Sequence, residues 1–294
     1  MANAPLLDRE FLEKLERLTI RWQKSFAGLV GGHNMSRSAG AGQEFLDHRN
    51  FHHGDDLRAV NWRAYLRLEK LFLKMFQVEP RVPVRMLVDV SESMTPYGGK
   101  KFEYARKLAA ALCYVGLVRL DSIEFHAFSN SLSPRFFCTG GRHRFPGVLE
   151  SLTGLKPGGV TDYLAAVREF IGNYSQRGLV IIISDFLDDA GCERAIQYLT
   201  DYGHELMLLQ VWTDEDRMPP WVGELDLRDA ETGAALKLDF DEIARERYTR
   251  AFDDYCAVLQ TLAMRSGGRY AGISTSQSLE SVIFGDLVKV RGIA

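Results

Sequence analysis

Asp89, Ser91 and Ser93 place a carboxylate and two hydroxyls at alternate positions, directly after the mainly apolar run 82–88. If that run forms a buried strand, the loop that follows it can direct all three oxygen groups at one point. Mg²⁺ and Mn²⁺ favour oxygen ligands of this kind, whereas a thiol or imidazole cluster would indicate zinc. We therefore expect a site for Mg²⁺ or Mn²⁺, with Ca²⁺ as a less favoured ion.

Two further polar positions follow later in the chain. Thr161 comes after the turn Gly158-Gly159 at the start of an expected helix, and Asp185 follows the apolar run 179–183. Binding sites of open parallel α/β sheets collect outside the carboxyl ends of the strands, so these residues are expected to join the first three. Taken singly, each residue is better explained as a helix cap or a turn former; together they indicate a metal site.

This set of Asp89, Ser91, Ser93, Thr161 and Asp185 resembles the metal-ion-dependent adhesion site of von Willebrand factor A domains. The resemblance implies that both serines bind the ion directly and that the threonine binds it directly or through water. It also implies that the two aspartates act mainly through coordinated water. A ligand set with so little direct negative charge leaves the cation electrophilic, so its open position would take an acidic side chain from a partner protein.

The hydrophobic pattern predicts the elements that position these residues. Strands are expected at 82–88, 122–128, 132–137, 179–183, 206–212 and 269–273. Helices are expected at 101–118, 142–153, 162–174, 189–201 and 248–262. A hairpin is expected at the sheet edge over 224–238. This order predicts an α/β fold with a Rossmann-like, doubly wound, mostly parallel sheet, as in von Willebrand factor A domains.

Residues 1–80 are expected to precede this domain, which would span 81–294, as a helix over 8–30 and a small β-containing module packed on the sheet. The module contains Gly-x-Glu-Phe at 42–45 and an Arg-x-x-x-x-Gly-Asp-Asp-x-Arg-x-x-x-Trp block at 49–62. These blocks closely resemble the signature of the bacterial "domain of unknown function fifty-eight" family. Their charged residues and tryptophan are interpreted as a structural clasp between module and sheet, formed by Glu44, Arg49, Asp55, Asp56, Arg58 and Trp62. A second cation shared by the adjacent aspartates is the alternative.

The family resemblance also implies a kind of partner. Proteins of this family are commonly paired with MoxR-type AAA+ ATPases, so we expect an adaptor or co-chaperone that binds such an ATPase or its client. The formal net charge is −3, with 36 basic and 39 acidic residues, which indicates no overall electrostatic attraction to nucleic acid. No apolar run is long enough to span a bilayer, no secretory signal is visible, and the four cysteines lie far apart. A cytoplasmic protein without membrane insertion is therefore expected.

A competing hypothesis is a metal-dependent hydrolase of phosphoesters or peptides. The cation would then act as a Lewis acid, with Asp162, Asp185 or His126 as the base. The sequence offers no nucleophile elbow, no His-Glu-x-x-His motif and no dense carboxylate cluster, so ligand capture is the favoured interpretation. A third possibility is that the site stays empty and the sheet surface alone mediates contacts.

Overall fold

The computed structural model describes residues 6–21, 44–52, 57, 60–77, 83–174, 176–187 and 191–294. The chain divides into two compact units, one of Ser25–Val82 and one of Met1–Lys24 together with Pro83–Ala294. This division differs from the expected boundary after residue 80, because the N-terminal helix groups with the larger unit. Its residue Leu15 is fully buried, and the next residue, Glu16, accepts a 2.9 Å hydrogen bond from the Tyr114 hydroxyl.

A six-stranded sheet forms the centre of the larger unit, in the order β10-β7-β6-β3-β4-β5. The strands are β3 (Val84–Asp89), β4 (Ile123–Phe128), β5 (Phe136–Cys138), β6 (Leu179–Ser184), β7 (Glu205–Trp212) and β10 (Arg269–Ser274). All neighbouring strands run parallel except β5, which pairs antiparallel with β4. The predicted mostly parallel α/β sheet is therefore confirmed.

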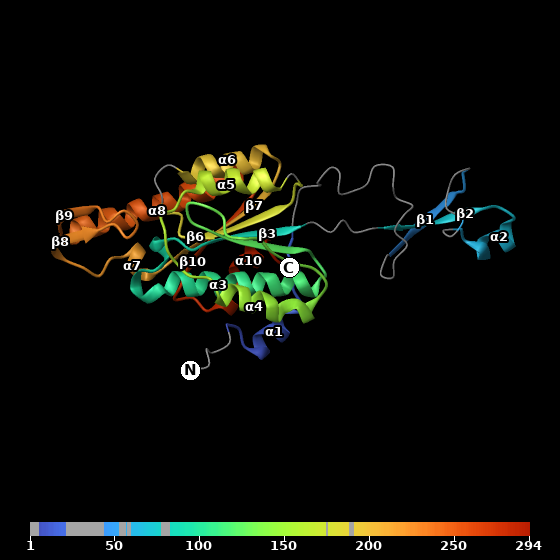
Figure 1. The fold of residues 1–294 in the computed structure, drawn as a ribbon, viewed down its shortest axis with the longest axis horizontal. Helices are drawn as coiled ribbons and strands as arrows, with labels where there is room; N and C mark the ends of the chain where they lie inside the picture. Colours follow the sequence, from blue (N-terminus) through green and yellow to red (C-terminus); the bar gives the residue numbers. More distant parts are fainter. Residues whose placement is uncertain are drawn as a thin grey trace. The chain divides into compact units, whose positions relative to one another are not determined.

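Helices cover both faces of this sheet, which explains why every residue of β3 and β6 is buried. In Figure 1, α5 (Tyr163–Asn173) and α6 (Gly191–Asp201) lie on one side of the sheet, opposite α3 (Pro96–Val118) and α4 (Phe145–Thr153). The C-terminal part of α8 (Glu242–Arg265) packs with α5 and α6 in one hydrophobic core. Within the described residues, no helix is long and apolar enough to cross a membrane.

Helix α3 begins irregularly. Tyr97, Gly98 and Gly99 have φ values of 57°, 76° and 73°, a left-handed conformation that glycine adopts without steric cost. Regular helix follows, and its small residues Ala109, Ala110 and Ala111 are fully buried. The irregular start comes shortly after the end of β3 in the chain, and Lys100 and Lys101 follow it directly.

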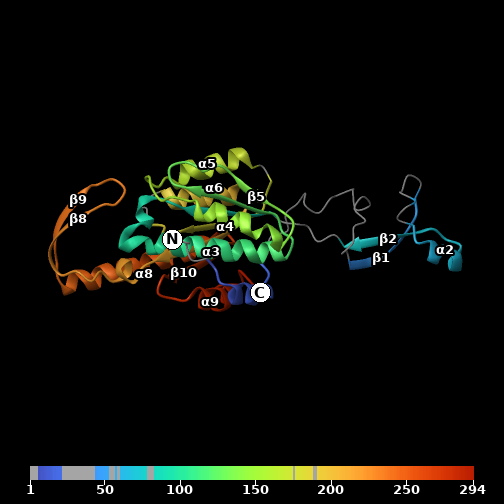
Figure 2. The same cartoon turned by 60° about the horizontal axis from the view of Figure 1, so that its bottom comes forward.

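The hairpin predicted over 224–238 is confirmed, but its predicted place at the sheet edge is wrong. Strands β8 (Gly223–Arg228) and β9 (Ala235–Phe240) pair only with each other and form a separate antiparallel sheet. In the chain the hairpin lies between α7 (Asp214–Arg217) and α8, and Figure 2 shows it as an arm next to one end of α8. Residues on β8 alternate between exposed and half-buried positions, so this hairpin covers little core and does not extend the central sheet.

The first helix is shorter than expected. Helix α1 (Arg9–Leu15) starts at the N-cap Asp8 and ends long before residue 30. The chain after it is extended because it pairs with the C-terminus, where Thr19 N–H donates to the Ala294 carbonyl at 2.7 Å. Residues 22–30 of the predicted helix lie outside the described residues. Short C-terminal elements that were not predicted complete the unit: α9 (Leu279–Ser281), η4 (Val282–Asp286) and α10 (Leu287–Lys289).

The smaller unit contains an antiparallel pair, β1 (Glu44–Asn50) and β2 (Phe72–Gln77), and the helix α2 (Trp62–Leu68). Trp62 begins this helix and is 54% exposed, with its ring edge-to-face against Tyr65. Glu44 and Arg49 lie on β1, while Asp55, Asp56 and Arg58 of the expected clasp lie outside the described residues. The clasp between module and sheet therefore stays a prediction.

Candidate functional site

The carboxyl end of β3 carries the first part of the candidate site. Asp89 is the last residue of the strand and is fully buried, and its Oδ1 accepts a 2.8 Å hydrogen bond from Ser91 N–H. This bond holds the turn that leads into the short 3₁₀ helix η2 (Glu92–Met94). The turn brings the Ser91 and Ser93 hydroxyl oxygens to 2.9 Å from each other. Two hydroxyls thus lie side by side next to a buried carboxylate.

The carboxyl end of β6 adds a residue that the sequence reasoning missed. Ser184 donates a 2.6 Å hydrogen bond to Asp89 Oδ2, and its oxygen lies 2.6 Å from the Tyr163 hydroxyl. The Phe186 N–H donates to the same serine oxygen at 3.0 Å. A serine hydroxyl can donate once and accept twice, so Ser184 is fully used as the link between the two strand ends. Its place at a strand end beside Asp185 was the signal available in the sequence.

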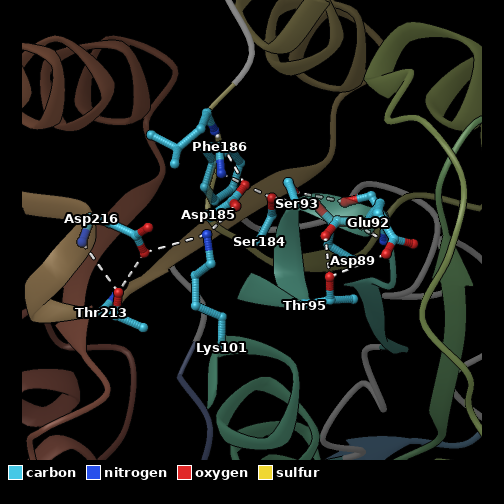
Figure 3. Close-up of polar contacts among 12 residues, drawn as sticks. Asp89, Glu92, Ser93, Thr95, Lys101, Ser184, Asp185, Phe186, Thr213 and Asp216 are labelled. Carbon is cyan, nitrogen blue, oxygen red and sulfur yellow. Dashed lines mark hydrogen bonds and ion pairs between the residues drawn. The ribbon is translucent and has the colours of Figure 1, made fainter. Parts of the chain in front are cut away.

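Asp185 faces a buried lysine, which Figure 3 shows between two carboxylates. Lys101 Nζ lies 2.8 Å from Asp185 Oδ2 and 3.3 Å from Asp216 Oδ2, and Lys101 is only 1% exposed. Asp216 is positioned by a capping box with Thr213 at the start of α7. Burial alone would lower the pKa of Lys101, but the two carboxylates outweigh it and raise the pKa above its usual value. The ammonium therefore stays charged and balances Asp185.

Asp89 has no such cation within its hydrogen-bonded contacts. Burial, and then repulsion from Asp185, raises the pKa of Asp89 to about 7. The hydrogen bonds from Ser184 and Ser91 act in the opposite direction, but they do not outweigh burial. A bound cation or a proton on Asp89 would therefore be electrostatically favourable at the end of β3.

A separate loop brings Thr161 to the end of β3, beside the turn that carries Ser91 and Ser93. Gly158 N–H donates to the Val90 carbonyl at 2.6 Å, and Glu92 N–H donates to the Gly159 carbonyl at 2.9 Å. These backbone bonds fasten the loop before Thr161 to the turn that carries Ser91 and Ser93. The polar groups of Thr161 itself, however, are bonded to Glu231 of the β8–β9 turn.

The structure therefore joins only part of the predicted set by hydrogen bonds. Asp89, Ser91 and Ser93 form one hydrogen-bonded group, whereas Asp185 and Thr161 each bond a side chain that was not predicted. One of these, Lys101, lies in helical phase with the buried Ala105 and Leu108, so a charge within an apolar stripe was its signal. The other is Glu231, which gave no signal because it lies in an exposed hairpin turn.

The bases considered for a hydrolase are occupied by structural contacts. Asp162 accepts a 2.8 Å hydrogen bond from Ala165 N–H and caps α5. His126 is buried within β4, with Nδ1 3.0 Å from the Ser133 carbonyl and Nε2 3.0 Å from the Tyr174 hydroxyl. Asp185, the third candidate base, is ion-paired with Lys101.

The donor set of this corner is unusual for a metal site. Among the described residues, no group of three or more His, Cys, Asp or Glu side chains is arranged to hold a metal ion. A cation at the end of β3 would therefore depend on the hydroxyls of Ser91 and Ser93, with Asp89 behind them. Such a set suits a hard divalent cation and contains none of the soft ligands that select zinc or copper.

Fold and site together define a doubly wound α/β protein with a hydroxyl-rich polar corner at the carboxyl edge of a parallel sheet. Its residues 47–280 match the family described as "Protein of unknown function DUF58", and the chain belongs to that family. It is 25% identical over 260 residues to the uncharacterized protein Rv1480 of Mycobacterium tuberculosis, which covers 85% of this chain and 80% of that protein.

Two solved structures are also similar to this chain. The conserved hypothetical protein BatB from Bacteroides thetaiotaomicron aligns with a TM-score of 0.43 and 19% identity, covering 71% of this chain and 98% of that one. A von Willebrand factor type A structure from Catenulispora acidiphila aligns with a TM-score of 0.36 and 15% identity, covering 62% of this chain and 44% of that one.

Proposed function

We propose that this protein is an interaction module that captures a partner's acidic side chain through Mg²⁺ or Mn²⁺ held at the end of β3. The observation that carries the proposal is the 2.9 Å approach of the Ser91 and Ser93 hydroxyls beside Asp89, which is fully buried. Two neutral oxygens at this separation can face one ion, and the carboxylate behind them supplies the compensating charge.

The residues fit a hard divalent cation on two grounds. All candidate donors are oxygens, which is the ligand type that these ions prefer. The Asp89 carboxylate is buried next to a second carboxylate, so burial and Asp185 raise its pKa to about 7, and a nearby cation would relieve this repulsion. We assign direct contact to Ser91 and Ser93, with Thr161 contributing directly or through water.

The ion would supply a Lewis-acidic position for a carboxylate oxygen. The chain's own residues perform the remaining tasks: Ser184 ties Asp89 to the end of β6, and the 158–159 loop keeps Thr161 beside the serine turn. Lys101 is the counter-charge shared by Asp185 and Asp216, so it reduces the net negative charge near the end of β3. A low negative charge favours the approach of an acidic partner.

We propose a binding role without catalysis, because Asp162 and His126 are engaged in structural hydrogen bonds and Asp185 in an ion pair. The partner would be a protein with an exposed Asp or Glu. The resemblance of the module sequence to its family favours a MoxR-type AAA+ ATPase, or a client of that ATPase, as this partner.

Calorimetric titration with Mg²⁺ and Mn²⁺ tests the metal part of this proposal. Ser93→Ala should weaken binding strongly, because it removes a direct ligand from a half-buried position. Ser122→Ala is the matched control, since Ser122 precedes β4 at the opposite edge of the sheet and should leave the affinity unchanged. Equal affinity of the wild type and Ser93→Ala would remove this site from consideration.

A second experiment tests the partner. The purified MoxR-type ATPase of the same organism should be retained by the immobilised wild-type protein in Mg²⁺ and released by EDTA. Ser93→Ala should fail to retain the ATPase, whereas Ser122→Ala should retain it. Retention that is independent of both the chelator and Ser93 would contradict a metal-mediated contact.

A further inference from the structure

Glu231 differs from its neighbours in the turn that joins β8 to β9. Ala230 and Thr232 are exposed, as are all residues from Thr232 to Lys237, whereas Glu231 is half-buried. An acidic side chain at the tip of a hairpin is expected to point into water. Its burial therefore requires a specific contact.

That contact is with Thr161 of the candidate site, and it uses both oxygens of the carboxylate. Thr161 N–H donates to Glu231 Oε2 at 2.8 Å, and the Thr161 hydroxyl donates to Glu231 Oε1 at 2.6 Å. A carboxylate that accepts two hydrogen bonds from one residue is held in position and in orientation. The hydroxyl directs its only proton at Glu231, and its oxygen keeps lone pairs available for a cation.

The turn is built to present this side chain. Asp229 Oδ1 accepts hydrogen bonds from Glu231 N–H at 3.0 Å, from Thr232 N–H at 2.6 Å and from the Thr232 hydroxyl at 2.7 Å. Backbone hydrogen bonding from Thr232, followed by its hydroxyl, lowers the pKa of Asp229. Because the turn is ordered by its own contacts, the hairpin can place Glu231 without support from the central sheet.

The base of the hairpin is attached separately from its tip. Trp221, just before β8, stacks on Tyr97 with ring centroids 6.3 Å apart, and Phe240 at the end of β9 contacts Tyr248 edge-to-face. Neither strand pairs with the central sheet. The contact of Glu231 with Thr161 is thus a polar latch at the end of an arm, and the arm can remain attached when the latch opens.

We propose that Glu231 is an internal carboxylate ligand that occupies the position reserved for the partner's acidic side chain. This inference rests on the proposed function, since it names what regulates the same site. Two carboxylates cannot share one position without strong repulsion, so a partner must displace the β8–β9 turn before it binds. The partner competes with this latch for the site, and removing the latch should strengthen partner binding.

The first test asks whether the latch forms in solution, in EDTA so that no metal contributes. Hydrogen exchange of the Thr161 amide, measured by NMR, should speed up about tenfold or more in Glu231→Ala, because its acceptor is lost. Glu224→Ala is the control, since it removes an exposed glutamate of the same hairpin and should leave the exchange unchanged. If the Thr161 amide exchanged at the same rate in the wild type and in Glu231→Ala, the proposal would be overturned.

The second test uses Mn²⁺ and a hexaglutamate peptide as the probe of carboxylate binding. With saturating Mn²⁺, Glu231→Ala should bind the peptide about tenfold more tightly than the wild type and Glu224→Ala do, as expected when a competing internal ligand is lost. EDTA should abolish the difference. Equal peptide affinities of three Mn²⁺-loaded proteins would overturn the latch and leave the metal site intact. Absence of Mn²⁺ binding in all three would instead overturn the proposed function, and the inference with it.

Discussion

Lys101 Nζ lies 2.8 Å from Asp185 Oδ2, and each of the two side chains is only 2% exposed. The lysine comes from the start of α3 and the aspartate from the residue after β6, so this ion pair joins a helix to the edge of the sheet. A second carboxylate, Asp216, lies 3.3 Å from the same nitrogen. The Lys101 ammonium is thus a fixed positive charge within the site region. Because Asp185 is paired with it, we interpret Asp185 as a supporting residue and not as a direct metal ligand.

Replacing Lys101 by an uncharged residue should lower the free energy of unfolding. Lys101→Met leaves the carboxylates of Asp185 and Asp216 close together without their shared counter-charge. Breaking a buried ion pair by removing one partner typically destabilises a protein by about 3–5 kcal/mol. Urea unfolding should therefore show a loss of that size for Lys101→Met at pH 7.

Lys100→Met provides the control for this prediction. Lys100 is exposed and pairs with Glu215 at 3.1 Å, and exposed pairs contribute at most about 1 kcal/mol. If both variants lost the same small amount, the buried pair would not have the structural role assigned to it.

The pKa of Asp89 predicts a pH dependence of the metal-free protein. Burial and Asp185 raise this pKa from 3.8 to about 7, so the folded state favours the protonated form. The contribution of the protonated Asp89 carboxyl to folding stability is complete at pH values below the unfolded pKa, and it is lost as the pH rises through about 7. Relative to the wild type in EDTA, Asp89→Asn should therefore gain stability between pH 4 and pH 8, by at most about 4 kcal/mol.

Thermal unfolding across this pH range measures the effect. Any constant cost of replacing the carboxylate by an amide cancels, because only the change with pH is compared. Asp226→Asn, at an exposed position of β8, should follow the wild-type curve. Curves for wild type and Asp89→Asn that stay parallel from pH 4 to pH 8 would contradict the assignment.

Gly159 should be sensitive to the smallest side chain. Its φ is +94°, and an added Cβ would meet Ser129 Oγ at 3.0 Å. Gly159→Ala is expected to cost about 1–3 kcal/mol and to shift the loop that positions Thr161, lowering the affinity for Mn²⁺. Gly147→Ala in α4 has open space and ordinary φ, so it should be neutral or stabilise by up to about 1 kcal/mol. Similar Mn²⁺ affinities for the two variants would show that loop geometry does not matter.

Much of the fold could be predicted because buried parallel strands are continuous apolar runs. Residues 179–183 are an example, and residues 84–88 are apolar except for Arg85; the two strands lie in the centre of the sheet. The hairpin around the 229–233 turn was recognisable from its turn residues, but its separation from the sheet was not, because pairing partners depend on tertiary contacts. Helix α1 was predicted too long because a residue that follows it, Thr19, pairs with Ala294 at the far end of the sequence, and such a pairing leaves no local pattern.

The site was predictable only in part. Asp89, Ser91 and Ser93 are close in sequence, so their common location at a strand end could be inferred from local pattern. The partners that engage Asp185 and Thr161 come from 84 and 70 residues away in the chain. No periodicity or motif connects Glu231 to Thr161, and only the folded structure brings them together.

Anomalous scattering from crystals grown with Mn²⁺ tests the central claim most directly. The account predicts a manganese peak within about 2.0–2.3 Å of the Ser91 and Ser93 hydroxyl oxygens, beside Asp89 at the end of β3. The peak should disappear in crystals of Ser93→Ala and persist in those of Ser122→Ala. Well-ordered density for both serines without manganese between them, under conditions that saturate other Mn²⁺ sites, would contradict the account.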